Sequence, residues 1–108
     1  MVKKLTPITP GEILMEEFMK PLGLTQSQLA KDINVPPNRI SQIINGKREI
    51  TADTALRLGK YFGIEPEFWL NLQMRYNMKL AQSKIGNKIA KEVKVYNFKD
   101  KTGQLVAA

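Results

Sequence analysis

The sequence contains no cysteine and no histidine among its 108 residues. A chain without cysteine forms no disulfide and offers no thiolate nucleophile, and one that lacks both residue types has no plausible zinc site. Histidine is also the usual base that activates a serine or threonine nucleophile. We therefore expect a protein that is not an enzyme and that has no cofactor.

Long apolar runs are also missing. No stretch approaches the roughly 18 consecutive apolar residues that a membrane-spanning helix requires. The N-terminus starts with polar residues and lacks the apolar core and small-residue cleavage site of a secretory signal. Together with the absence of cysteine, these features predict a cytoplasmic protein with no membrane partner.

Acidic residues are outnumbered. The chain has 17 Lys and Arg against 10 Asp and Glu, which gives a net charge of +7. This excess favours a polyanionic partner, and charge alone leaves nucleic acid and an acidic protein surface both open. A chain of this length is expected to form one domain with tails.

Helix-start and helix-stop residues predict five helices with no strand between them. The first is expected to begin with a capping box formed by Thr9 and Glu12 and to end at Pro21 and Gly23. Short connections between the helices predict a compact all-α, five-helix domain. The expected helices span residues 10–20, 25–33, 37–45, 51–62 and at least 66–80.

Residues 24–48 have the pattern of a helix-turn-helix DNA reader, in which a tight turn joins two short amphipathic helices. Pro37 suits the first turn of the second of these helices. Ile40, Ile43 and Ile44 then recur at helical spacing and are expected to face the core.

The polar residues of that second helix are expected to lie outside. Asn and Gln can form two hydrogen bonds with adenine, Arg can bridge O6 and N7 of guanine, and an apolar side chain at the helix tip can contact a thymine methyl. Neighbouring polar and basic residues are suited to phosphates, whose contacts fix register without reading sequence. The predicted base-contacting residues are Pro37, Asn38, Arg39 and Gln42, and the predicted phosphate-contacting residues are Gln26, Ser41, Asn45, Lys47 and Arg48.

A simpler alternative is that these residues are outside because every soluble helix needs a polar face. That explanation suffices for any single residue. It is weaker for the set, because caps, turn length, apolar stripe and groove-compatible side chains would all have to coincide.

Other conspicuous residues are interpreted as structural. Trp69, with Phe68 and Tyr76 at helical spacing, is expected in the core or at a dimer contact. Four further polar residues are interpreted as caps and surface positions: Thr51, Asp53, Thr54 and Ser83.

The composition changes after Leu80. Residues 78–101 contain seven Lys against one Glu and one Asp. Apolar residues keep a four-residue period there, so the last helix could continue or a sixth could form, and residues 93–98 alternate like a strand or a docking segment. We divide the chain into an N-terminal arm (1–8), a helix-turn-helix DNA-binding domain (9–80) and a Lys-rich C-terminal extension (81–108).

Five motifs occur in order along the chain, and together they resemble the HigA family of antitoxins within the wider lambda-repressor-like, XRE-type superfamily. The resemblance covers Thr9 to about Leu80. Its motifs are Pro10-Gly11-Glu12-Ile13-Leu14, Val35-Pro36-Pro37-Asn38-Arg39-Ile40, Asn45-Gly46-Lys47-Arg48, Ile50-Thr51-Ala52-Asp53-Thr54-Ala55-Leu56-Arg57-Leu58 and Pro66-Glu67-Phe68-Trp69-Leu70-Asn71-Leu72-Gln73.

This resemblance implies a homodimer that binds its own operator DNA, represses its operon, and neutralises a HigB-type toxin, which is an mRNA-cleaving ribonuclease. It also implies base contacts from Pro37, Asn38, Arg39 and Gln42, and phosphate contacts from Gln26, Asn45 and Lys47. These sets overlap the residues selected above on chemical grounds.

Two alternatives remain open from the sequence. One is a stand-alone helix-turn-helix transcriptional regulator without a toxin partner. The other is a protein-interaction module whose basic tail docks on an acidic partner and whose DNA reader is vestigial. A third, single-stranded RNA binding, is disfavoured because we expect no stacking aromatics at exposed positions.

Overall fold

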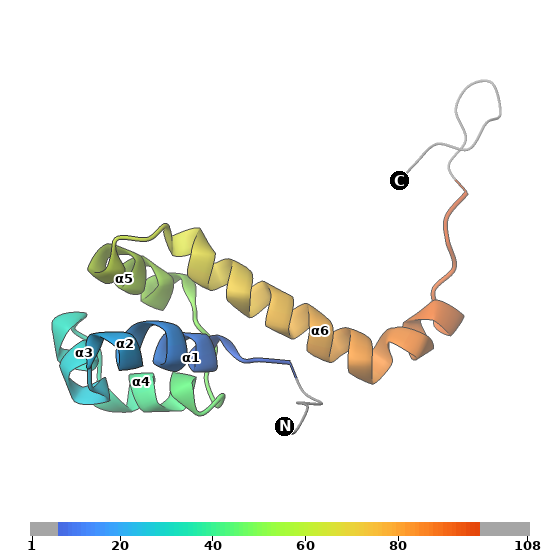
Figure 1. Cartoon of the computed structure of the whole chain (residues 1–108). Coiled ribbons are helices and arrows are strands. Elements are labelled where there is room, and N and C mark those ends of the chain that lie inside the picture. The colour runs from blue at the N-terminus through green and yellow to red at the C-terminus, as the bar shows by residue number, and fades with distance from the viewer. Residues whose placement is uncertain (1–6, 98–108) are drawn as a thin grey trace, which may run out of the picture.

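The computed structural model describes residues 7–97, and within that range it is built of helices without a strand (Figure 1). The first helix of the chain is continuous but changes its hydrogen-bond pattern, so it is labelled as three parts, α1, η1 and α2. The elements are α1 (Pro10–Ile13), η1 (Leu14–Met19), α2 (Lys20–Leu22), α3 (Gln26–Asp32), α4 (Pro37–Ile44), α5 (Ala52–Phe62) and α6 (Pro66–Glu92). The all-α prediction is confirmed.

The start of the first helix is as predicted. The Thr9 hydroxyl accepts a hydrogen bond from the Glu12 amide at 3.1 Å, and the Glu12 carboxylate accepts one from the Thr9 amide at 3.3 Å. This reciprocal pair is the capping box.

Gly23, whose φ is +64°, ends the first helix as predicted, but the prediction that Pro21 also ends it is wrong, because the helix runs through Pro21 to Leu22. Residues 14–19 form a π-helical segment, in which the Lys20 amide donates to the Met15 carbonyl five residues earlier. Proline has no amide hydrogen, and its ring clashes with the preceding turn of a regular α-helix. The wider π turn just before Pro21 accommodates both defects.

The helix-turn-helix unit consists of α3, the turn at residues 33–36, and α4. Thr25 caps α3 by accepting from the Gln28 amide at 3.1 Å. Asn34 adopts the left-handed conformation in the turn, with φ +58°, and Pro37 is the first residue of α4. At the other end of α4, Gly46 adopts φ +73° and the Lys47 amide returns to the Gln42 carbonyl at 2.8 Å, so the predicted glycine stop is confirmed.

The core lies where the first helix, α3, α4, α5 and the start of α6 meet. Trp69 is fully buried, which confirms its predicted core position, and its ring centroid lies 4.8 Å from that of Phe18. Phe62 and Phe68 complete this aromatic cluster. The buried apolar residues are Leu14, Met19, Leu29, Ala30, Ile33, Val35, Ile40, Ile43, Ile50, Ala55, Leu58 and Trp69.

A glycine sets how closely the first helix approaches α4. Gly11 is buried, and a Cβ atom at this position would overlap the Ile43 carbonyl and lie 2.7 Å from the Cα of Ile44. Only a residue without a side chain permits this approach of the two backbones. Gly11 therefore allows the C-terminal end of α4 to pack directly against the backbone of α1.

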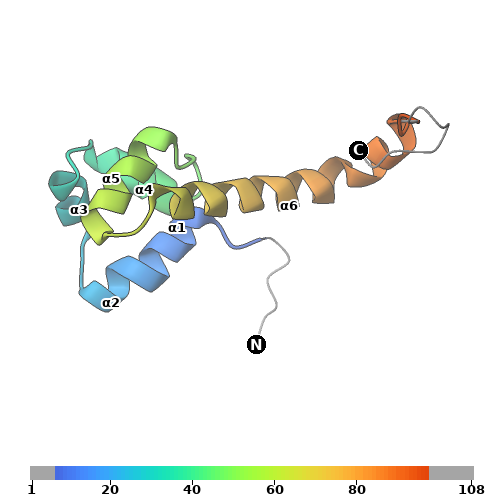
Figure 2. The same cartoon turned by 90° about the horizontal axis from the view of Figure 1, so that it is seen from above.

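The last helix is longer than the predicted minimum. α6 contains 27 residues, and its N-terminal part packs on the core through Trp69 and Gln73, whose side-chain carbonyl accepts from the Ile50 amide at 2.9 Å. Past Leu80 its residues are exposed except for Gly86, and α6 projects from the domain in both views (Figures 1 and 2). No helix within residues 7–97 has the combined length and apolarity that crossing a membrane would need.

The alternating segment after α6 forms no strand in residues 93–97, so the strand interpretation is wrong for them, and Phe98 lies outside the described residues. The part of the chain that the structure describes contains no strand with which this segment could pair. The expected N-terminal arm and C-terminal extension also lie partly outside the described range.

Candidate nucleic-acid interface

The α4 helix separates its apolar and polar residues onto different faces. Ile40 and Ile43 are buried in the core, at 0% and 1% exposure, and Ile44 is half-buried against it. Asn38 and Gln42, on the polar face, are exposed and half-buried respectively. The folded domain thus presents the side chains that suit base edges while it buries the isoleucine stripe.

The predicted base-contacting residues all lie on α4. Pro37 and Asn38 are exposed in its first turn, which is the part that reaches bases in helix-turn-helix proteins. Arg39 is half-buried, because it is held by another side chain. The base contacts themselves stay predictions.

The predicted phosphate-contacting residues surround α4. Gln26 is half-buried at the start of α3, Asn45 follows α4 as its C-cap, and Lys47 and Arg48 are exposed in the next turn. Ser41 is on α4 itself, where its hydroxyl donates to the Asn38 carbonyl at 3.1 Å. The hydroxyl proton is therefore already used within the helix, and only the lone pairs of the oxygen stay available. Because a phosphate oxygen needs a donor, Ser41 is the least suited of the five residues to a phosphate contact.

Arg39 forms an ion pair that crosses between two helices. Its Nη1 donates to Oδ2 of Asp53, at the start of α5, over 2.9 Å. Its Nε is buried and has no hydrogen-bond partner among residues 7–97. The Arg39 side chain is 22% exposed, so it lies against the domain.

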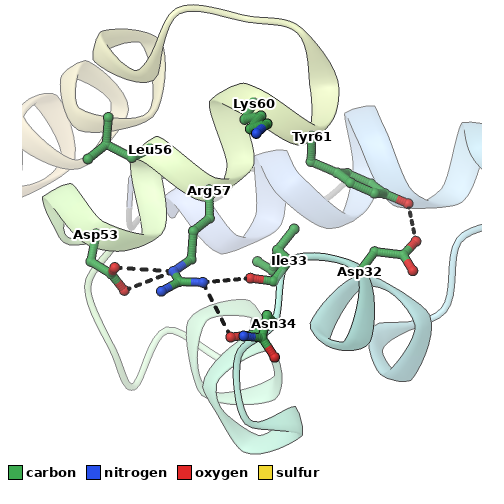
Figure 3. Close-up of a pocket in the computed structure, with 8 residues that line it drawn as sticks. All are labelled: Asp32, Ile33, Asn34, Asp53, Leu56, Arg57, Lys60 and Tyr61. Carbon is green, nitrogen blue, oxygen red and sulfur yellow. Dashed lines mark hydrogen bonds and ion pairs between the residues drawn. The ribbon is translucent and has the colours of Figure 1, made fainter.

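Asp53 also binds Arg57, one turn further along α5 (Figure 3). The Nε of Arg57 donates to the two Asp53 carboxylate oxygens at 3.1 and 3.3 Å, and its Nη1 donates to the carbonyls of Ile33 and Asn34 at 2.9 and 3.3 Å. Arg57 therefore clamps the turn of the helix-turn-helix unit to α5. The Arg57 hydrogen bond, and then the charge of Arg57 and the contact with Arg39, hold the pKa of Asp53 below its ordinary value, against a smaller opposing effect of desolvation.

A second contact ties α3 to α5 at the same pocket. The Tyr61 hydroxyl donates to Oδ2 of Asp32 at 2.6 Å (Figure 3). The Gln28 side-chain amide donates to the other oxygen of that carboxylate. The hydrogen bond to Asp32, with desolvation and the carboxylate charge, raises the pKa of Tyr61. The pocket between these contacts has a volume of about 650 Å³ and is lined by Asp32, Ile33, Asn34, Asp53, Leu56, Arg57, Lys60 and Tyr61.

The sequence interpretation missed the role of Asp53 and Arg57. Their spacing of four residues on a helix was a usable sign of an ion pair. The contact with Arg39 joins positions 14 residues apart on different helices, and no local pattern predicts it. Thr54, also interpreted as a cap or surface residue, is buried at 2% exposure, and Thr51 precedes α5 without a side-chain capping bond. Ser83 is exposed, as expected.

Comparison with known proteins assigns this arrangement to a family. A helix-turn-helix family profile matches residues 15–69. Virulence-associated protein I of Dichelobacter nodosus is 51% identical over 79 residues, which cover 73% of each chain. An uncharacterized HTH-type transcriptional regulator of Haemophilus influenzae is 47% identical over 72 residues, or 67% of each chain.

Two solved structures share the fold and much of the sequence. An addiction module antidote protein of the HigA family from Coxiella burnetii is 55% identical with a TM-score of 0.81, and the match covers 85% of this chain and 100% of that one. Pseudomonas aeruginosa antitoxin HigA, solved with the higBA promoter, is 38% identical with a TM-score of 0.79, over 82% and 96% of the two chains. The chain belongs to the helix-turn-helix family and, within it, to the HigA-family antitoxins.

Proposed function

We propose that this protein binds the promoter of its own operon in a sequence-specific manner and represses it. The observation that carries the proposal is the α4 helix, which buries Ile40 and Ile43 and presents Asn38 and Gln42 on its polar face. These amide side chains match the donor and acceptor pattern of adenine in the major groove. The P. aeruginosa HigA structure with promoter DNA supports the same use of the domain.

The roles within the interface follow from chemistry and position. Pro37, Asn38, Arg39 and Gln42 contact bases, and the flanking phosphate contacts come from Gln26, Asn45, Lys47 and Arg48. Ser41 contacts a phosphate only if its hydroxyl gives up the hydrogen bond to the Asn38 carbonyl. The base contacts confer sequence preference, whereas the phosphate contacts set the position of α4 in the groove.

Each subunit has one reader helix, so a homodimer brings two reader helices to the same operator. Two such helices lie about 34 Å apart, one turn of DNA, in helix-turn-helix dimers. We therefore propose a palindromic operator with half-sites at that spacing. Sedimentation of the free protein tests the dimer, since a monomeric mass at micromolar concentration contradicts it.

The second activity we propose is neutralisation of a HigB-type, mRNA-cleaving toxin. Membership of the HigA-family antitoxins supports it. Co-expression with the product of the adjacent gene tests it: growth arrest by that product alone, relieved by this protein, is the expected result. A harmless neighbouring product, or one whose toxicity persists, argues against the proposal.

A reporter placed behind the native promoter tests repression. Supplying this protein in trans is expected to lower reporter output, and a variant with Asn38→Ala and Gln42→Ala is expected to restore it. Glu17→Gln, at an exposed position on the first helix and outside the helix-turn-helix unit, serves as the control for expression and folding. Equal output with and without the protein contradicts autorepression.

A stand-alone regulator is the second candidate function, and the similarity to the H. influenzae transcriptional regulator favours it. It differs from the antitoxin proposal only in the partner protein. Repression of the reporter together with the absence of a toxic neighbouring product selects it.

The exposed distal half of α6 suggests a role for the Lys-rich extension. Lys84, Lys88 and Lys91 lie on the part of α6 past Leu80, which is exposed and projects from the domain (Figure 1). We assign these charges to contacts with the DNA backbone outside the groove that α4 reads. A toxin-docking arm is the alternative, and removal of the charges separates the two.

A further inference from the structure

We propose that Asp53 is a specificity-determining residue of the DNA interface, acting through Arg39. The inference rests on the proposed DNA-binding function and assigns a task within it to a side chain outside the reader helix. Asp53 orients the Arg39 guanidinium and keeps it from pairing with any phosphate that comes within reach.

Arg39 is in direct contact with Asp53. Arg39 is in the first turn of α4, among the residues proposed to read bases, and its Nη1 is bound by Asp53 over 2.9 Å. Nε of the same guanidinium is buried, so the group is enclosed on that side. Its remaining donors therefore lie in a plane fixed by the protein, which is the condition for two parallel hydrogen bonds to a guanine edge.

Asp53 is itself held in place by Arg57. Arg57 donates to both of its carboxylate oxygens and, through Nη1, to the carbonyls of Ile33 and Asn34 (Figure 3). Asn34 has φ +58°, so Arg57 binds the turn that sets α4 against α3 at its left-handed residue. The chain of contacts links the position of Arg39 to the geometry of the turn.

Asp53 also changes the net charge around Arg39. An unpaired arginine on a flexible stem adds affinity for every DNA sequence, because it can neutralise phosphates anywhere along the backbone. Asp53 offsets part of that charge, because the carboxylate is shared with Arg57 and the three side chains together carry +1 in place of the +2 of two unpaired arginines. A device of this kind lowers binding to wrong sites more than binding to the right one.

The test compares four full-length proteins on the promoter duplex and on a scrambled duplex of equal length: wild type, Asp53→Asn, Arg39→Ala, and the double variant. Asp53→Asn keeps the size of the side chain and removes its charge. Glu17→Gln is the matched control, because it removes the same charge from an exposed position on the first helix. Dissociation constants are measured by fluorescence anisotropy at several salt concentrations, and thermal unfolding is followed for each protein.

The expected result is that Asp53→Asn lowers the ratio of promoter to scrambled affinity by about five-fold or more, the effect of removing one directed base contact. Binding of scrambled DNA strengthens, and its salt dependence steepens by about one released counterion. The double variant shows no further reduction beyond Arg39→Ala, because Asp53 acts through Arg39. In a series of promoter base-pair substitutions, Asp53→Asn flattens discrimination at the same pair as Arg39→Ala.

A ratio that changes no more than in Glu17→Gln overturns the proposal, as does a reduction in Asp53→Asn that persists in full when Arg39 is absent. A uniform reduction at every base pair also overturns it, since that is the signature of a merely structural role. If Asp53→Asn does not fold, Asp53→Ala provides the same test, because alanine also removes the carboxylate that holds Arg39 and is tolerated at an exposed helical position. Failure of the proposed function itself is distinct, because the wild-type protein would then show no promoter preference.

Discussion

At the residue scale, the reader helix carries side chains in two different states. Asn38 is exposed, whereas Arg39 is bound to Asp53 through a 2.9 Å contact. A free side chain adapts to the DNA that it meets, and a held one is already ordered and loses less conformational entropy on binding. The two residues therefore contribute to recognition in different ways.

Replacing Arg39 by alanine tests the contribution of the held side chain. We expect Arg39→Ala to weaken promoter binding by about 1–3 kcal/mol and to relax preference at one base pair. Titrations against promoter variants that differ at single positions measure both effects. If affinities for promoter and scrambled DNA fall equally, Arg39 contacts a phosphate and not a base.

The ionisation of Asp53 provides a test within the free protein. Arg57→Gln is expected to raise the pKa of Asp53, because it removes the largest cause of the depression. A depressed pKa means that this carboxylate stabilises the fold at pH values above the unfolded-state pKa near 4. That stabilisation disappears as the pH falls through the lower, folded-state value.

Carboxyl-carbon NMR shifts followed against pH measure this pKa directly. Thermal unfolding of wild type and Asp53→Asn is expected to differ above about pH 4 and to converge below it. An unchanged pKa in Arg57→Gln contradicts the contact network.

Some features of the interface could be predicted from the sequence, and others could not. The exposed set on α4 could be predicted, because one helix fixes which positions share a face. The Arg39–Asp53 contact could not, because it depends on how α5 is placed against α4. Thr54 was misassigned for the same reason: its side chain is polar, but α5 directs it into the core.

At the element scale, helix boundaries set by local hydrogen bonds or by a left-handed glycine could be predicted, whereas the boundary expected at a proline could not. Thr9 and Thr25 cap their helices through local hydrogen bonds that the sequence specifies. Pro21 did not end its helix, because the π-helical segment before it absorbs the defect. A rule that holds for a regular α-helix fails when the hydrogen-bond register changes.

Gly11 tests the packing of α1 on α4. Gly11→Ala is expected to destabilise the domain by about 1–3 kcal/mol, because the new methyl group meets the backbone at Ile43 and Ile44, which cannot move as a flexible side chain would. Urea unfolding measures the decrease in stability. A stability equal to that of wild type contradicts the close approach.

Gly86→Ala is the matched control for that substitution. Gly86 is helical, and a Cβ there meets only Gln82, at an ordinary contact distance of 3.9 Å. Alanine is favoured over glycine in a helix by about 0.5–1 kcal/mol, so helical content by circular dichroism is expected to rise without a decrease in stability.

At the scale of the whole molecule, a packed domain carries a helix that extends beyond it. The domain could be predicted from the sequence, because the apolar periods and the helix caps agree with one another. The length of α6 could not, because an exposed helix has no core-facing apolar stripe to mark its end. The distal part of α6 is held by backbone hydrogen bonds and not by packing.

Neutralising the distal lysines tests whether α6 contacts DNA. Replacing Lys84, Lys88 and Lys91 by glutamine in the full chain is expected to reduce the salt dependence of DNA binding by about 0.9 for each phosphate that is no longer neutralised, while the preference for the promoter is retained. An unchanged salt dependence together with abolished toxin binding assigns the extension to the toxin instead.

If α4 reads the bases of a specific duplex, its exposed amide side chains set the preference for the promoter. The most direct measurement is a titration of the wild-type protein, and of the Asn38→Ala/Gln42→Ala variant, against promoter and scrambled duplexes at two salt concentrations. We predict that wild type prefers the promoter by about a thousand-fold or more, and that the variant loses most of this preference with little change in salt dependence. Equal binding of the two duplexes by wild type, strongly dependent on salt, would mean that the protein offers DNA only a basic surface, and would contradict base reading by α4.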